Sequence, residues 1–238
     1  MGLPFGAYAP PAFSPSDVAG LTLWLDASQI TGVADGGTLA TWPDMSGNGY
    51  NATQATVADQ PTYYKSTAGK TVNGLPAVWY PASTEFMQTG AFVSALTVGT
   101  IFLVGRAPYP SAATINLCSG ISSGSVWAIF TYGSTSPWSL WEGASVLASG
   151  TVNDGAMHQL TGLFAGTAST ALRLDGAQIV SGTAGSGSLT GFTIGADWNG
   201  AADVTPDFMA EALVYNAVLS AADVASVESY LHQKWATP

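Results

Sequence analysis

The stretch Asp207-Phe-Met-Ala-Glu-Ala-Leu-Val-Tyr-Asn216 decides the fold, because a strand pattern here runs almost directly into a helix pattern. Alternate residues form two sets, and both contain large apolar groups: Phe208, Ala210, Ala212 and Val214 in one, Met209, Glu211, Leu213 and Tyr215 in the other. The pattern predicts a central strand that is covered on both faces, with the two sets on opposite sides.

A short helix is expected over residues 220–234. Ser220 supplies a hydroxyl N-cap, and Asp223 follows three residues later. Four apolar residues then recur at helical spacing: Val224, Val227, Leu231 and Trp235. No other part of the sequence has a convincing helix pattern, so we expect this helix to pack on the outside of sheets built by the upstream residues.

The composition favours one large all-β domain. The 238 residues include 28 Gly and 13 Pro, a mixture typical of many short strands joined by tight turns. Only 8% of the residues are charged, against roughly 25% in ordinary soluble domains, and the formal net charge is −10. Nucleic acid and anionic membranes are therefore poor partners, because no basic patch is available to hold phosphate.

Strand patterns recur along most of the chain. Besides the strand near the C-terminus, strands are expected at residues 18–26, 39–42, 62–64, 77–80, 86–88, 96–106, 114–118, 125–132, 139–142, 157–164, 171–175, 177–180 and 191–195. Asp175-Gly176 predicts a two-residue hairpin turn of the primed type, and the loop over residues 43–51 is rich in Gly and Asn. About a dozen closely spaced strands predict a sandwich or a barrel. Membrane insertion is not expected, because no segment approaches eighteen uninterrupted apolar residues.

Residues 1–17 are expected to form an extended arm that precedes a domain over residues 18–238. Four prolines in residues 1–16 prevent a regular helix or an interior strand. We expect this arm to dock either on its own domain or on a neighbouring chain. Its aromatic residues Phe5, Tyr8 and Phe13 are the candidates for burial against a partner chain. The N-terminus has no basic region and no proline-free apolar run, so we expect no signal peptide and synthesis in the cytoplasm.

Several short motifs, taken in order, resemble the laminin-G-like modules of the concanavalin A-like lectin and glucanase superfamily. They are Leu23-Trp-Leu-Asp-Ala27, Trp42-Pro-Asp-Met-Ser-Gly-Asn-Gly-Tyr-Asn-Ala52, Asn73-Gly-Leu-Pro-Ala-Val78, Thr100-Ile-Phe-Leu-Val104, Leu174-Asp-Gly176, Ile194-Gly-Ala196 and the final strand with its helix. The resemblance covers about residues 18–235. It implies a two-sheet antiparallel jelly-roll sandwich, and it leaves function to be argued from the site, since this superfamily holds binders, glycosidases and structural modules.

No catalytic set is expected. Glycoside hydrolysis needs two carboxyl groups about 5 to 10 Å apart, and the Glu-x-Asp-x-x-Glu type motif of the superfamily's glucanases has no match here. The four glutamates lie on separate expected elements: Glu85, Glu142, Glu211 and Glu228. Glu211 is more simply interpreted as a residue that ties the last strand to its neighbours.

No cofactor is expected, although calcium stays open as the less favoured alternative. Asp44 and Asn48 are weak candidate ligands in the loop over residues 43–51. The twelfth-position glutamate of an EF-hand loop is missing, since that position holds Ala55. A structural Asx turn is therefore the better interpretation. The single cysteine and two histidines cannot assemble a zinc cluster.

Aromatic residues of the second half form the candidate ligand-binding site: Tyr132, Trp138, Trp141, Trp198 and the neighbouring Asn199. An indole face can lie against the apolar side of a sugar ring while Asn or Asp binds its hydroxyl groups. For any single Trp, core filling is the alternative. Trp138 and Trp198 are the two that we expect to be exposed.

Two functional interpretations follow from these features. The preferred one is a non-enzymatic, lectin-like structural protein of a bacteriophage virion, a capsid decoration or a head or tail appendage. Its partners would be other virion proteins, further copies of itself and a cell-surface glycan. The alternative is a free carbohydrate-binding module, and a glycoside hydrolase ranks below both.

Overall fold

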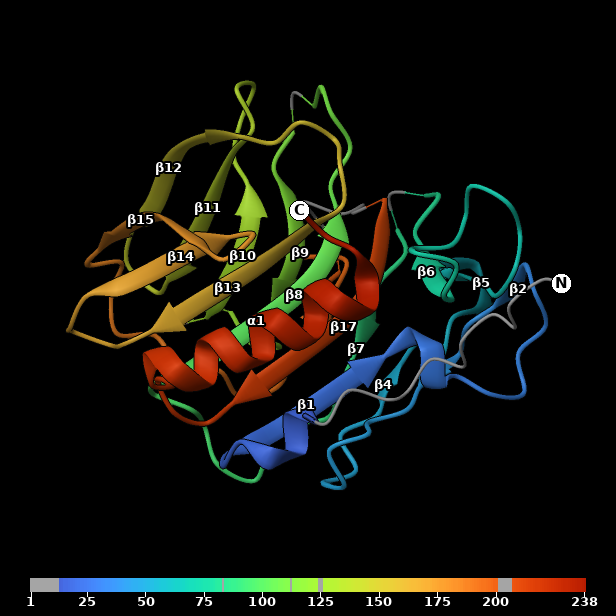
Figure 1. Cartoon of the computed structure of the whole chain (residues 1–238), viewed down its shortest axis with the longest axis horizontal. Coiled ribbons are helices and arrows are strands. Elements are labelled where there is room, and N and C mark those ends of the chain that lie inside the picture. Colours follow the sequence, from blue (N-terminus) through green and yellow to red (C-terminus); the bar gives the residue numbers. More distant parts are fainter. Residues whose placement is uncertain (1–12, 83, 112, 124–125, 201–206) are drawn as a thin grey trace, which may run out of the picture.

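The computed structural model describes residues 13–82, 84–111, 113–123, 126–200 and 207–238, which form two antiparallel sheets and one α-helix (Figure 1). The first sheet runs in the order β15 (Ala177–Gly182), β14 (Thr170–Leu174), β13 (His158–Phe164), β8 (Gly99–Arg106), β17 (Phe208–Tyr215), β6 (Ala77–Trp79), β5 (Thr62–Tyr64) and β2 (Gly37–Thr38), and β1 (Leu21–Asp26) also pairs with β17. The expected fold class, an all-β two-sheet sandwich with one C-terminal helix, is confirmed.

The second sheet runs in the order β12 (Val146–Val152), β11 (Pro137–Glu142), β10 (Trp127–Thr131), β9 (Ile115–Ser119), β16 (Thr193–Ile194), β7 (Met87–Gln88), β4 (Ala52–Thr53) and β3 (Thr41–Trp42). Short 3-10 turns lie at η1 (Pro15–Asp17), η2 (Ala27–Gln29) and η3 (Val57–Asp59). The main core lies between the two sheets, where Trp42, Trp127 and Trp138 are fully buried.

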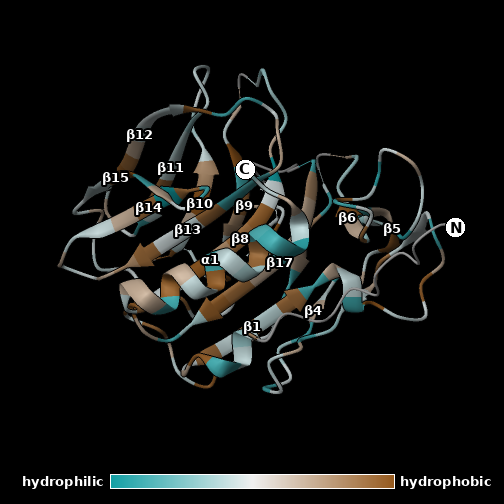
Figure 2. Cartoon of the chain, in the orientation of Figure 1, coloured by the Kyte–Doolittle hydropathy of each residue, from teal (hydrophilic) through white to brown (hydrophobic). Residues whose placement is uncertain are grey.

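Helix α1 (Ala221–Trp235) lies across the outer face of the first sheet, over β8, β13 and β17 (Figure 1). Ser220 Oγ accepts a hydrogen bond from the backbone N–H of Asp223, as the N-cap pattern predicts. The apolar face of α1 packs on Phe102, Leu213 and other residues of the sheet. Figure 2 shows hydrophobic colour along β8 and β17 where the helix crosses them. No helix of the described residues has the length and apolar character needed to span a membrane.

Strand β17 is buried along its whole length, so the prediction of a doubly covered central strand is confirmed. The predicted division of its residues between the two faces was wrong. The pairing of β17 with β8 shifts register between Met209 and Glu211. As a result, Met209, Ala212 and Val214 join the core between the sheets, whereas Phe208, Ala210, Leu213 and Tyr215 join the cluster under α1. A bulge adds one residue on one strand, so strict alternation cannot hold across it.

Local turn signals were accurate. Asp175 and Gly176, with φ of 48° and 80°, connect β14 to β15 as the expected hairpin. Gly47 and Gly49 have positive φ in the loop over residues 43–51, as expected there. Strand β12 was not predicted, because Val146-Leu-Ala-Ser-Gly-Thr-Val152 is a half-exposed edge strand without a clear alternation of apolar residues.

Candidate functional site

The outer face of the second sheet carries a row of four paired residues. Ala128 of β10 pairs with Ser119 of β9 on one side and with Trp141 of β11 on the other. Trp141 in turn pairs with Val146 of β12. Since residues paired across neighbouring strands share a face, all four side chains lie on the same side of the sheet. Their neighbours in sequence, including Trp127 and Leu140, belong to the core on the opposite side.

This face is hollowed into a groove of about 300 Å³. Its lining comes from four neighbouring strands, β9 to β12, and from the loops around them: Thr114, Asn116, Ser119, Val126, Ala128, Phe130, Tyr132, Trp141, Val146, Asp197 and Trp198. With the second sheet written as sheet B, we call this surface the sheet-B groove. Apolar walls with a few convergent polar groups are typical of a small-ligand site.

Tyr132 and Trp198 are the most exposed aromatic residues of the sheet-B groove, at 48% and 37% of their surface. The Tyr132 ring packs edge to face on Phe130, with ring centroids 6.1 Å apart. The backbone carbonyl of Trp198 accepts a hydrogen bond from Gln88 Nε2 at 3.0 Å, which anchors its turn to β7. These contacts hold two aromatic side chains at the rim of the groove.

Asn116 is a buried polar residue of the same groove. It lies opposite Phe130 in the β9–β10 pairing and is 6% exposed. Its side-chain amide makes no hydrogen bond to another residue in the part of the chain that the structure describes. The amide oxygen and nitrogen of Asn116 are not among the sealed, unpartnered polar atoms of the described residues, so they are open to water or to a ligand in the groove. The groove therefore presents two donors and one acceptor to an incoming ligand.

The structure brings three of the five predicted ligand-binding residues together, since Tyr132, Trp141 and Trp198 all line the sheet-B groove. Asn199 is exposed in the turn after Trp198, but it is not part of the lining. The expected exposure of Trp138 was wrong, because Trp138 is fully buried. Three positions separate it from Trp141 on β11, so the two indoles point to opposite faces of the sheet. The sequence analysis also missed Asn116, whose only signal was its place in a strand.

The expected partner-binding arm is described only from Phe13 onward, and Phe5 and Tyr8 lie outside the described residues. The Phe13 ring packs on Tyr230 of α1, with centroids 6.2 Å apart. Residues 14–17 belong to the folded body rather than to a free arm, since Pro15 is buried and its carbonyl accepts a hydrogen bond from the Tyr215 hydroxyl at 2.9 Å.

The loop over residues 43–51 uses its polar side chains for local hydrogen bonds. The Asp44 carboxylate accepts hydrogen bonds from the backbone N–H groups of Trp24, Ser46 and Tyr50 and from the Ser46 hydroxyl. Asn48 directs its NH₂ group to the carbonyls of Leu21 and Thr22. Asp44 therefore forms the hydrogen bonds of an Asx turn, and the calcium alternative stays a prediction. In the described residues, no group of three or more His, Cys, Asp or Glu side chains is placed to hold a metal.

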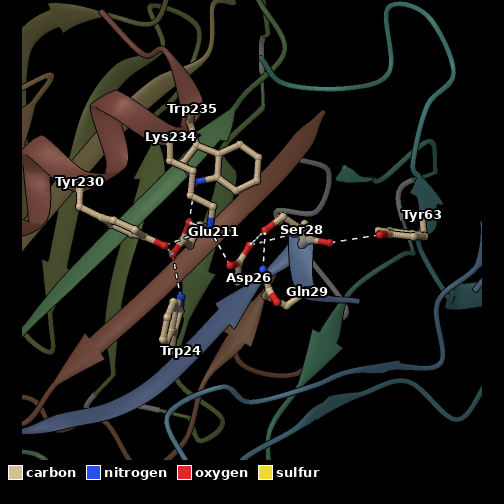
Figure 3. A network of polar contacts seen from close by, with 10 residues as sticks. Trp24, Asp26, Ser28, Gln29, Tyr63, Glu211, Tyr230, Lys234 and Trp235 are labelled. Carbon is tan, nitrogen blue, oxygen red and sulfur yellow. Dashed lines mark hydrogen bonds and ion pairs between the residues drawn. The ribbon is translucent and has the colours of Figure 1, made fainter. Parts of the chain in front are cut away.

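A second polar centre lies where β1, β17 and the end of α1 meet (Figure 3). Glu211 is fully buried there and accepts four hydrogen bonds, from Trp24 Nε1, the Tyr230 hydroxyl, Lys234 Nζ and Trp235 Nε1. Burial and the nearby charge of Asp26 raise the pKa of Glu211, although Lys234 acts in the opposite direction. The expected role of Glu211, to tie the last strand to its neighbours, is confirmed.

Lys234 also bonds Asp26, at 2.5 Å, so one ammonium group lies between two carboxylates. Sequence analysis missed this pair, because Asp26 and Glu211 meet only through the β1–β17 pairing. A cavity of about 700 Å³ borders the cluster and is lined by Trp24, Asp26, Lys234 and seven other residues. Glu211 is fully buried and its four hydrogen bonds are internal, so it stabilises the packing of α1 on the sheet.

No family model matches the sequence, and no curated protein matches it in a sequence search. Solved structures do match in three dimensions. Domain 4 of AbnA, a GH43 extracellular arabinanase from Geobacillus stearothermophilus solved with arabinotriose, aligns over 88% of this chain and 98% of its own length, with a TM-score of 0.58 and 15% identity.

Two larger proteins contain a similar body. The binding domain of botulinum neurotoxin serotype D/C matches with a TM-score of 0.56 and 12% identity over 92% of this chain, and Trypanosoma rangeli sialidase matches with a TM-score of 0.56 and 14% identity over 92%. The chain spans about half of the toxin domain and a third of the sialidase, at 53% and 34% of their lengths. At these identities the likeness establishes the fold. The protein is a two-sheet antiparallel β-sandwich with one C-terminal helix.

Proposed function

We propose that this protein is a non-enzymatic glycan-binding module and that the sheet-B groove is its binding site. The observation that carries the proposal is the convergence of Tyr132, Trp141 and Trp198 on one groove together with the unpartnered amide of Asn116. An aromatic face covers the apolar C–H surface of a sugar ring. The Asn116 amide can exchange hydrogen bonds with the ring hydroxyls, which are themselves both donors and acceptors.

The position of the groove supports binding rather than catalysis. A glycosidase needs an acid and a second carboxyl group on either side of the scissile bond. Asp197 is the one acidic residue among the described residues that line the groove, and the buried pair of Asp26 and Glu211 lies on the first sheet. The arabinotriose complex of the AbnA domain, which has the same fold, also supports a carbohydrate ligand.

The test is glycan binding by the intact chain and by Trp141→Ala, Trp198→Ala and Asn116→Ala. We expect each substitution to weaken binding at least tenfold, which corresponds to about 1.4 kcal/mol. Isothermal titration with any oligosaccharide that binds the intact chain on an array gives the affinities. Trp24→Phe is the control, because Trp24 lies on β1 in the other sheet. Unchanged affinity in all three groove variants would contradict the proposed site.

We further propose that the module is displayed on a larger particle, with a phage virion as the preferred setting and a free carbohydrate-binding module as the alternative. The proline-rich segment of residues 1–12, with Phe5 and Tyr8, is the proposed means of attachment, and it precedes Phe13, whose ring packs on Tyr230 of α1. Deleting residues 1–12 removes Phe5 and Tyr8 and keeps the contacts of Pro15. The deletion should abolish incorporation into the particle and leave the circular dichroism spectrum and the glycan affinity unchanged. Normal incorporation of the deletion variant would contradict attachment through this segment.

A further inference from the structure

Among its described residues, the sheet-B groove has no positively charged group. The described lining contains one acidic residue, Asp197, and no Lys, Arg or His. The remaining polar side chains of the lining are neutral: Thr114, Asn116, Ser119 and Tyr132. An acidic sugar that entered this groove would have to lose part of its hydration without gaining an opposite charge, which is unfavourable.

No Lys or Arg from elsewhere in the chain is placed to bind an acidic sugar in the sheet-B groove. The whole sequence has five Lys and Arg residues. Three are held in ion pairs: Arg106 with Asp207 at 2.5 Å, Arg173 with Glu228 at 2.8 Å and Lys234 with Glu211 at 2.8 Å. Lys70 lies over the ring of Trp79 at 3.4 Å. Lys65 directly follows β5, which belongs to the first sheet rather than to the sheet that bears the groove.

The two histidines are also held away from the sheet-B groove. His158 lies on β13 of the first sheet, and its two ring nitrogens contact Asp175 at 2.7 Å and Asp154 at 2.9 Å. His232 lies on α1, and its Nδ1 contacts the carbonyl oxygen of Thr237. The His158 ring also packs on Trp138 between the sheets, with ring centroids 5.9 Å apart. Protonation of either ring would therefore place its charge beside these internal partners and not in the lining of the sheet-B groove.

The net charge of the chain also disfavours the binding of acidic sugars. A formal charge of −10 repels anions at long range in dilute salt, and Asp197 repels them at contact. We propose that the sheet-B groove selects neutral glycans and rejects those that carry a carboxylate, such as sialic or uronic acids. This selectivity rests on the proposed glycan-binding function of the groove, and it specifies neutral glycans as the class of ligand.

The experiment uses pairs of glycans that differ in charge on one backbone. Oligogalacturonate is compared with its full methyl ester, and 3′-sialyl-N-acetyllactosamine with N-acetyllactosamine, and arabinotriose is included as a further neutral probe. Affinities of the full chain are measured by titration in 20 mM and 500 mM NaCl. In low salt we expect the acidic member of a bound pair to bind at least tenfold more weakly. The difference should shrink in high salt, because screening shortens the reach of the repulsion.

Asp197→Asn removes the acidic charge from the groove, so it separates repulsion by Asp197 at contact from the long-range repulsion by the net charge. Within this variant, the ratio of neutral to acidic affinity should fall several-fold relative to the wild type. Acidic members that bind as tightly as their neutral partners, with binding still abolished by Trp141→Ala, would overturn the selectivity and leave the groove as a glycan site. Silence of the wild-type chain toward every probe, neutral and acidic, would overturn the glycan-binding function itself and the selectivity with it.

Discussion

The Glu211 carboxylate and the Lys234 ammonium lie 2.8 Å apart, both buried, and join the centre of the first sheet to the end of α1. Replacing Glu211 with Gln leaves the ammonium with Asp26 as its only carboxylate partner. Since removing one partner of a buried ion pair is costly, we expect Glu211→Gln to lower the free energy of unfolding by about 3 kcal/mol. Urea unfolding followed by Trp fluorescence measures the change.

Trp24→Phe is the matched control for the same cluster. It removes one of the four donors to Glu211 and leaves the ion pair in place. A loss of about 1 kcal/mol is expected. Equal losses in the two variants would show that hydrogen bonding, and not the buried charge, makes the larger contribution.

Truncation of Trp138 should lower the free energy of unfolding much more than truncation of Trp198. Trp138 is fully buried between the sheets, so Trp138→Ala should lower the free energy of unfolding by about 4 kcal/mol through the cavity that it leaves. Trp198 is more than a third exposed, so Trp198→Ala should cost less than about 1 kcal/mol. Chemical denaturation of both variants provides the comparison. A strongly destabilised Trp198→Ala would contradict this expectation and would show that the indole contributes mainly to the stability of the fold.

His158 makes stability depend on pH above pH 6.5. Burial by itself lowers the pKa of the imidazole, but hydrogen bonds to Asp175 and Asp154 and their negative charges outweigh it, so the pKa is raised above 6.5. Because the folded state holds the proton more tightly than the unfolded state, this stabilisation is fully present below pH 6.5. It is lost as the pH rises through the raised value. NMR titration of the ring should show the elevated pKa, and Asp175→Asn should lower it.

Glu85 makes stability depend on pH in the acidic range. Burial raises its pKa to about 7, and the charge of Asp59 adds to this, against a hydrogen bond from the backbone N–H of Ala82. Its contribution to stability is present below about pH 4.5 and is lost as the pH rises from there to 7, by up to about 3 kcal/mol. Thermal melts of wild type and Glu85→Gln between pH 4.5 and 7.5 test this. Parallel pH profiles of the two proteins would contradict it.

Much of the fold could be read from local patterns. The N-cap at Ser220 and the apolar spacing after it predicted α1 to within one residue at each end. Asp175-Gly176 predicted a turn because its backbone needs positive φ at both positions. The buried final strand was evident from apolar residues on both faces. Each of these signals lies within about ten residues of chain, which is the range over which backbone preferences and side-chain spacing act.

The candidate site could be predicted only in part. Its aromatic residues are conspicuous in the sequence, so three residues of the sheet-B groove were predicted to bind a ligand. Which of them face outward was not predictable for Trp138 and Trp141, since the inner and outer faces of β11 are both apolar. Asn116 had no distinguishing signal, because its role depends on lying opposite Phe130 across the β9–β10 ladder.

The sequence alone therefore determined the class of fold, its closing helix, its tight turns and a surface short of positive charge. Tertiary structure alone decided the bulge that exchanges the faces of β17, the meeting of Asp26 with Glu211, and the groove that gathers Tyr132, Trp141 and Trp198. The reason is physical. Turns and caps are stabilised by neighbouring residues, whereas strand register depends on which distant segments pair, and a shift of one residue moves every following side chain to the other face.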